Sequence, residues 1–133
     1  MSVLLDTHMW VWWITPSSRL RPREVSALDE LAKQGELRLS AISLWEVQVL
    51  HSKRRLDLPV PFGEWLLQAT DRRLLEVLPL DVDVILALHD LPAGFHGDPA
   101  DRIIVATGRA HALTLATRDT TISSSRAIKI WRA

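Results

Sequence analysis

The sequence of 133 residues contains no cysteine. This absence excludes a disulfide framework, a zinc site with thiolate ligands and a cysteine nucleophile. It is also what a reducing compartment favours, so we expect a cytoplasmic protein. No apolar run approaches the roughly 20 residues that a membrane-spanning helix needs, and no basic and apolar leader precedes the first strand-like run. We therefore expect a soluble protein that has no membrane partner.

Several motifs of common enzyme classes are also missing. The sequence has no glycine-rich loop that would cradle a phosphate, no G-x-S-x-G nucleophile elbow and no H-E-x-x-H zinc motif. The five histidines are scattered and have no compact zinc-binding spacing, although we expect His8 and His96 to approach the acidic residues described below. The 16 basic residues balance the 16 acidic ones, and a net charge of zero by itself argues against nucleic acid as a partner.

What the sequence does contain is a regular alternation of short apolar runs and segments of helical spacing. The runs predict strands at residues 3–5, 37–42, 75–78, 113–116 and 128–131. The spacing predicts helices over residues 9–14, 23–33, 43–53, 62–70, 81–91 and 99–111. Strands that are apolar on both faces and separated by helices indicate a parallel sheet covered on each side. We expect an α/β fold in which residues 1–133 form a single domain, a three-layer α/β/α sandwich around a parallel β-sheet.

Five acidic residues follow a predicted strand or open a predicted helix: Asp6, Glu46, Asp98, Asp101 and Asp119. In open α/β sheets, sites form beyond the carboxyl ends of the strands, so a parallel sheet would bring these acids to one edge. Without them, 16 basic residues face 11 acidic ones, which leaves an acidic pit in a mildly basic surface. Carboxylates without cysteine or paired histidine suit the hard cations Mg²⁺ and Mn²⁺. Such an ion can assist hydrolysis of a phosphate ester.

Each acid also has a purely structural explanation. Asp6 and Asp98 are typical helix caps, and Pro99 suits the first helical position. The stretch from Ser43 to Glu46 matches a capping box, and Asp119 fits a plain turn. A metal site is favoured over these local roles only because acids occur at four separate strand–helix junctions, which a parallel sheet would bring together.

Two further residue types leave alternatives open. Thr7 and Thr117 either hydrogen-bond site carboxylates or satisfy backbone groups at strand ends. Among the six tryptophans, Trp10 and Trp13 lie three apart and can present one helix face to a partner protein, whereas Trp45 and Trp131 are expected in the core.

Four stretches of the sequence resemble a known family: LLDTH at residues 4–8, SAISLWEV at 40–47, HGDPADRIIVAT at 96–107 and LATRD at 115–119. In this order and spacing they resemble the PIN-domain family, in particular the VapC-like toxins of bacterial toxin–antitoxin pairs. The resemblance covers essentially the whole chain. Gly97 and Ala100 depart from it, because many relatives carry larger side chains there.

The resemblance implies a Mg²⁺-dependent endoribonuclease, with Mn²⁺ as an alternative ion. It implies that Asp6 and Asp101 are the principal metal ligands, that Glu46 and Asp119 complete the catalytic site directly or through water, and that Asp98 assists the site or only caps its helix. The implied partners are an RNA substrate, a cognate antitoxin that obstructs the site, and a second copy in a homodimer. The alternative function is a non-catalytic PIN-like module that binds RNA or protein.

Overall fold

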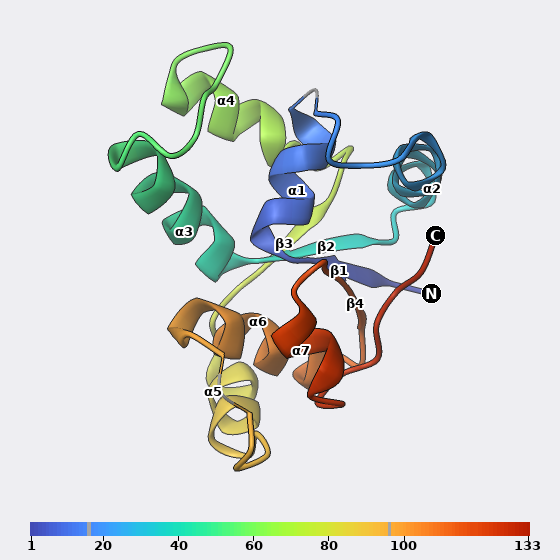
Figure 1. The fold of residues 1–133 in the computed structure, drawn as a ribbon, viewed down its shortest axis with the longest axis vertical. Helices are drawn as coiled ribbons and strands as arrows, with labels where there is room; N and C mark the ends of the chain where they lie inside the picture. The colour runs from blue at the N-terminus through green and yellow to red at the C-terminus, as the bar shows by residue number, and fades with distance from the viewer. Residues whose placement is uncertain (16, 96) are drawn as a thin grey trace.

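The computed structural model describes residues 1–15, 17–95 and 97–133, and the expectation for His96 falls outside them. Within these ranges the strands are β1 (Val3–Leu5), β2 (Leu37–Ser40), β3 (Glu76–Leu78) and β4 (Thr114–Ala116). The helices are α1 (Thr7–Ile14), α2 (Pro22–Lys33), α3 (Ala41–Ser52), α4 (Phe62–Ala69), α5 (Val82–His89), α6 (Pro99–Ala110) and α7 (Thr120–Ser124). Figure 1 shows their arrangement.

The strands form one parallel sheet in the order β3-β2-β1-β4. The central strand β1 is buried throughout, and its register pairs Leu4 with Arg38 on one side and with Leu115 on the other. The strand predicted at residues 128–131 is reduced to a single bridge between Leu115 and Ile130. This bridge lies beside β4, where the chain makes two backbone hydrogen bonds with Leu115 and then leaves the sheet.

Two hydrophobic cores lie on opposite faces of the sheet, and β1 contributes to both. Val3 and Leu5 belong to the core that is completed by α1, α2, α3 and α4, whereas Leu4 belongs to the core completed by α6 and α7. Alternate residues of a strand point to opposite faces, so this division requires helices on each side. Figure 1 shows these two helical layers, with α5 beside α6. The predicted three-layer α/β/α sandwich is confirmed.

The boundary between β2 and α3 differs from the prediction. The side chain of Ser40 accepts a hydrogen bond of 3.2 Å from the Ile42 backbone N–H and caps α3, so the helix begins at Ala41 and the strand ends two residues early. The predicted capping box at Ser43 is therefore wrong. Glu46 becomes the sixth residue of α3 and lies in its second turn.

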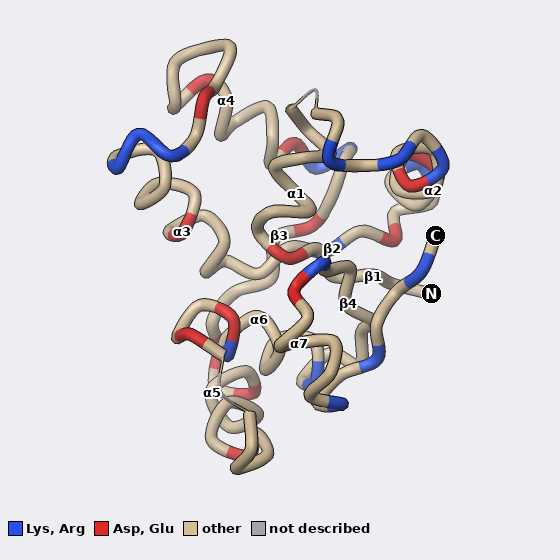
Figure 2. The backbone as a smooth tube through the Cα atoms, viewed as in Figure 1, with Lys and Arg blue, Asp and Glu red and all other residues tan. Residues whose placement is uncertain are grey.

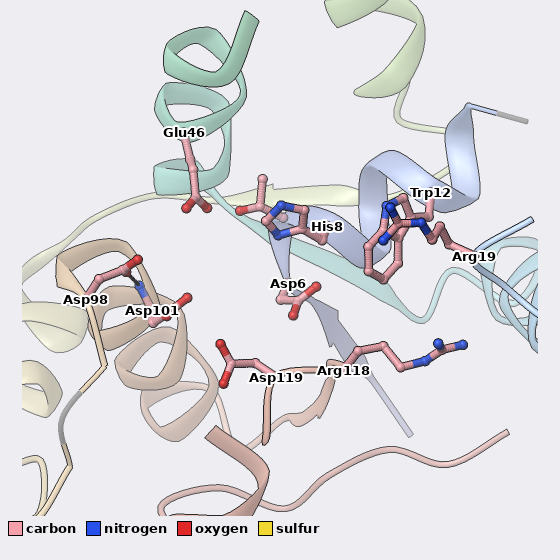
Figure 3. A pocket seen from close by; sticks show the side chains of 10 residues that line it. Asp6, His8, Trp12, Arg19, Glu46, Asp98, Asp101, Arg118 and Asp119 are labelled. Carbon is pink, nitrogen blue, oxygen red and sulfur yellow. Dashed lines mark hydrogen bonds between the residues drawn. The ribbon is translucent and has the colours of Figure 1, made fainter. Parts of the chain in front are cut away.

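Three helices start immediately beyond the carboxyl ends of strands. α1 follows β1, α3 follows β2, and α7 follows β4 after a short turn. Because the strands are parallel, these helix N-termini meet at one edge of the sheet, where the N-terminus of α6 also lies (Figures 1 and 3). Among the described residues, no helix has both the length and the apolar composition needed to cross a membrane.

Candidate active site

The edge of the sheet at these helix N-termini contains an open cavity of about 370 Å³. All five acids singled out in the sequence line it: Asp6, Glu46, Asp98, Asp101 and Asp119. Figure 3 shows that they come from the starts of α1, α6 and α7 and from α3, and converge on the same space. The parallel topology therefore brings together carboxylates that are up to 113 residues apart in the chain.

Asp6 lines the cavity, is buried and caps α1. Its Oδ1 accepts a hydrogen bond of 2.8 Å from the Met9 backbone N–H, and its Oδ2 accepts one from the hydroxyl of Thr117. The Thr117 hydroxyl in turn accepts a bond of 3.0 Å from the Asp119 backbone N–H. Burial raises the pKa of Asp6, and the bonds from Thr117 and Met9 partly offset that effect. Asp6 is thus both a helix cap and a site residue, and Thr117 takes the carboxylate-binding alternative.

Glu46 reaches the cavity because α3 is held against α1. The hydroxyls of Thr7 and Ser43 share a buried hydrogen bond of 2.8 Å that joins the first turns of the two helices. Ser43, which the sequence suggested as a helix cap, thus acts in this interhelical contact, and Thr7 bonds it in place of a carboxylate. Glu46, three residues further along α3, is left to face the other acids (Figure 3).

The remaining three acids stand at the starts of α6 and α7. Asp98 caps α6 by accepting a bond of 2.8 Å from the Asp101 backbone N–H, and Asp119 caps α7 by accepting one of 3.1 Å from the Ile122 backbone N–H. Asp101 lies in the first turn of α6. The helix α7 was not predicted from the sequence, which indicated only a turn at Asp119.

The electrostatics of the cavity are clearest at Asp101. Burial raises its pKa to about 7, together with the negative charges of Asp98, Asp119, Glu46 and Asp6. Every other acid of the cavity therefore repels a charge on Asp101. Either a proton or a cation relieves this repulsion, so the cavity favours positively charged ligands.

The donor set of the cavity suits a hard divalent cation, because it consists of carboxylate oxygens. Across residues 1–15, 17–95 and 97–133, however, no three His, Asp or Glu side chains stand together as ready ligands of one metal ion. Mg²⁺ usually keeps several waters and takes only one or two protein carboxylates, so such a closed set is not required for it. The residues present therefore fit a hydrated Mg²⁺ better than an ion held entirely by protein ligands.

Four further residues line the cavity, namely His8, Trp12, Arg19 and Arg118. Of these, only His8 was expected near the acids from the sequence. The guanidinium carbon of Arg19 lies 5.5 Å from the centre of the Trp12 ring. The centres of the His8 and Trp12 rings are 5.6 Å apart. Arg118 forms an ion pair with Glu24 of α2. The sequence could have indicated that Arg118 lies in the site, because it directly precedes Asp119. Arg19 lies in the connection between α1 and α2, where no sequence pattern points to the site.

The tryptophans are placed differently from what their spacing indicated. Trp10 is fully buried, and its indole N–H donates a bond of 3.0 Å to the Ala69 carbonyl, so it cannot belong to an exposed partner surface shared with Trp13. Trp45 was expected in the core but is 58% exposed. Trp131 packs against the core as expected.

Comparison with known proteins finds a matching family, a similar protein and similar solved structures. The PIN domain family matches residues 3–126. A Mycobacterium tuberculosis protein named ribonuclease VapC22 is 35% identical over 126 residues, which cover 94% of this chain and 92% of the relative. Among solved structures, VapBC2 from Rickettsia felis, bound to a DNA fragment from its promoter, contains a chain with a TM-score of 0.77 at 20% identity, covering 98% of both chains. A chain of a toxin–antitoxin complex from Klebsiella pneumoniae has a TM-score of 0.67 at 20% identity, covering 96% of this chain and 95% of that one.

Proposed function

This chain belongs to the PIN domain family and is a homologue of the VapC ribonucleases, and from this premise we propose that it is a metal-dependent endoribonuclease. The observation that carries the proposal is the convergence of five carboxylates in one cavity, where burial and the charges of the other four raise the pKa of Asp101 to about 7. Such a cavity suits a divalent cation and, through it, hydrolysis of a phosphodiester.

We assign Asp6 and Asp101 as the principal Mg²⁺ ligands, with Glu46 and Asp119 completing the site directly or through water. When bound, Mg²⁺ supplies Lewis-acid chemistry, increasing the acidity of water and offsetting the charge that develops on the phosphate. The protein side is preorganised: the hydroxyl of Thr117 and the Met9 N–H hold the Asp6 carboxylate in place. Asp98 caps α6 and adds negative charge beside Asp101.

RNA cleavage measured with Mg²⁺, with Mn²⁺ and with EDTA tests this function. We expect the wild type to cleave cellular RNA with either metal and to lose that activity in EDTA. Asp6→Asn and Asp101→Asn should each lower the rate by about 100-fold or more, the scale found for removing one electrostatic contact to a transition state. Asp81→Asn is the matched control, because Asp81 caps α5 as Asp6 caps α1 but does not line the cavity.

Two results would count against the proposal in different ways. If the metal-loaded wild type cleaves no RNA, the alternative of a non-catalytic PIN-like module that binds RNA or protein replaces the nuclease. If both site variants cleave as fast as the wild type, the assignment of the metal ligands is wrong although the activity is real.

We also propose that the enzyme is the toxin of a toxin–antitoxin pair, acts in the cytoplasm, is inhibited by a cognate antitoxin and forms a homodimer. The similarity to chains of VapBC2 and of a toxin–antitoxin complex supports the antitoxin partner. Exposed apolar side chains on α5, namely Val82, Ile85 and Leu86, support a protein–protein contact at that helix. Co-expression with a small DNA-binding protein encoded next to this chain should give a stable complex and restore growth, and failure of both would contradict the pairing.

A further inference from the structure

We propose that a second, arginine-lined pocket next to the acidic cavity seats a backbone phosphate of the RNA that flanks the cleaved bond. This proposal rests on the proposed ribonuclease function and adds to it a direction: the strand leaves the acidic cavity toward α2. Two observations support it: acidic and basic side chains lie at opposite ends of the acidic cavity, and arginines line the neighbouring pocket.

The acidic cavity has acidic side chains concentrated at one end and basic side chains at the other. Figure 3 shows Glu46, Asp98 and Asp101 at one end, and Arg19 and Arg118 at the other. A polyanion cannot extend toward the acidic end without meeting like charges at close range, whereas the arginine end attracts its phosphates. The substrate strand is therefore directed from the acids toward Arg19 and Arg118.

Arg118 belongs to a second pocket as well, of about 260 Å³. The basic side chains that line this pocket come from the start of α2, from the turn after β4 and from the end of the chain: Arg21, Arg23, Arg118 and Arg132. Thr117, whose hydroxyl bonds the Asp6 carboxylate, lines it too. Arg118 thus lines both pockets, and Thr117 links the second pocket to Asp6 of the first. Figure 2 shows basic positions gathering around the start of α2 and the C-terminal residues.

The second pocket stays positive after its own acids are counted. Burial acts to raise the pKa of Glu24, but hydrogen bonds from Arg118 and the Arg21 backbone outweigh it, so that the pKa is lowered and Glu24 is ionised. Glu24 offsets one of the four arginine charges of the pocket, which leaves three without a lining acidic side chain. The planar guanidinium fork matches phosphate oxygens, and Trp131 offers an aromatic face beside them.

A second basic cluster provides the comparison that the test needs. Arg54 and Arg55, with Asp57, line a separate pocket just beyond the C-terminal end of α3. The N-terminal half of α3 carries Glu46, so this cluster lies at the other end of that helix from the acidic cavity. It offers two arginines, the number that the test removes, but shares no lining residue with the acidic cavity.

RNA binding measured without catalysis tests the proposal. The probe is a short fluorescent single-stranded RNA pool of randomised sequence, whose Kd is determined by anisotropy in EDTA over a range of salt concentrations. The double variant Arg21→Gln/Arg132→Gln keeps the Arg118–Glu24 ion pair and is compared with Arg54→Gln/Arg55→Gln, which removes the same charge elsewhere. Circular dichroism melts of each protein confirm that the variants are folded.

Loss of the seat for one backbone phosphate of a single strand should reduce the slope of log Kd against log salt by about 0.7 and weaken binding at 0.1 M salt by about 5-fold. The Arg54/Arg55 variant should keep the wild-type slope. Arg21→Lys/Arg132→Lys should restore the slope, because it restores the charge.

Three results would overturn the proposal: a wild type that binds no RNA, an Arg21/Arg132 variant that binds like the wild type, or equal losses in the two glutamine variants. The last result would mean that only net charge matters. A wild type that cleaves RNA while the Arg21/Arg132 variant binds normally refutes the phosphate seat but leaves the ribonuclease intact. If RNA binding depends on Arg21 and Arg132 but the protein cleaves no RNA, the ribonuclease function is refuted and the phosphate-binding pocket is supported.

Discussion

Replacing Asp101 by asparagine should stabilise the metal-free protein at pH 8, although it damages the site. The folded protein raises the pKa of Asp101 from its ordinary 3.8 to about 7, first through burial and then through the charges of Asp98, Asp119, Glu46 and Asp6. The folded state therefore binds this proton more tightly than the unfolded state does. Between about pH 4 and pH 7 the wild type loses stability as pH rises, and above pH 7 the full penalty of the charged carboxylate is present.

The size of this penalty follows from the shift. About 3 pKa units correspond to about 4 kcal/mol at 1.36 kcal/mol per unit. Asp101 is only half-buried, so screening by solvent reduces this to about 2 kcal/mol. The asparagine also loses a favourable interaction with the dipole of α6, which costs about 0.5 kcal/mol. We expect a net gain of about 1.5 kcal/mol, or a Tm higher by roughly 5 °C for a domain of this size.

The assay is thermal unfolding of wild type and Asp101→Asn in EDTA at pH 8 and at pH 4. Asp83→Asn is the control, because Asp83 also lies in the first turn of a helix but outside the cavity, and this variant should be slightly less stable than the wild type. Added Mg²⁺ should stabilise the wild type more than Asp101→Asn, since a ligand stabilises the state that binds it. The reasoning is refuted if Asp101→Asn is no more stable than the wild type at pH 8, or if its advantage is unchanged at pH 4.

The remaining predictions concern Thr117 and the exposed face of α5. Thr117→Val removes the hydroxyl that lowers the pKa of Asp6, so the acid limb of the pH–rate profile for RNA cleavage should move to higher pH, and Thr117→Ser should restore it; an unchanged profile would contradict the role of this bond. The chain alone should sediment as a dimer at tens of micromolar, and Leu86→Asp should shift it toward monomer, because Leu86 is 57% exposed on α5. A monomeric wild type would contradict the homodimer.

Much of the fold was predictable because it depends on local patterns. The run at Val3–Leu5 is apolar at every position, which requires cover on both faces of the sheet, and the structure provides it. Gly35 takes a backbone φ of 71° after α2, a conformation that suits glycine, and so marks the end of that helix. The start of α3 was misplaced because Ser40 and Ser43 are equally good caps in sequence, and only packing against Thr7 assigns Ser43 to another role.

The sequence by itself determined which acids to consider, since each follows a strand or opens a helix, and parallel strands end at a common edge. It could not distinguish capping from site roles. In the structure the two roles are compatible, because Asp6, Asp98 and Asp119 each cap a helix with one oxygen and also line the cavity. The basic wall around Arg19 and Arg118 and the arginine pocket beside it arise only from tertiary structure. Their residues come from separate segments without a shared periodicity, so it is the folded chain alone that places positive charge on one side of the acids.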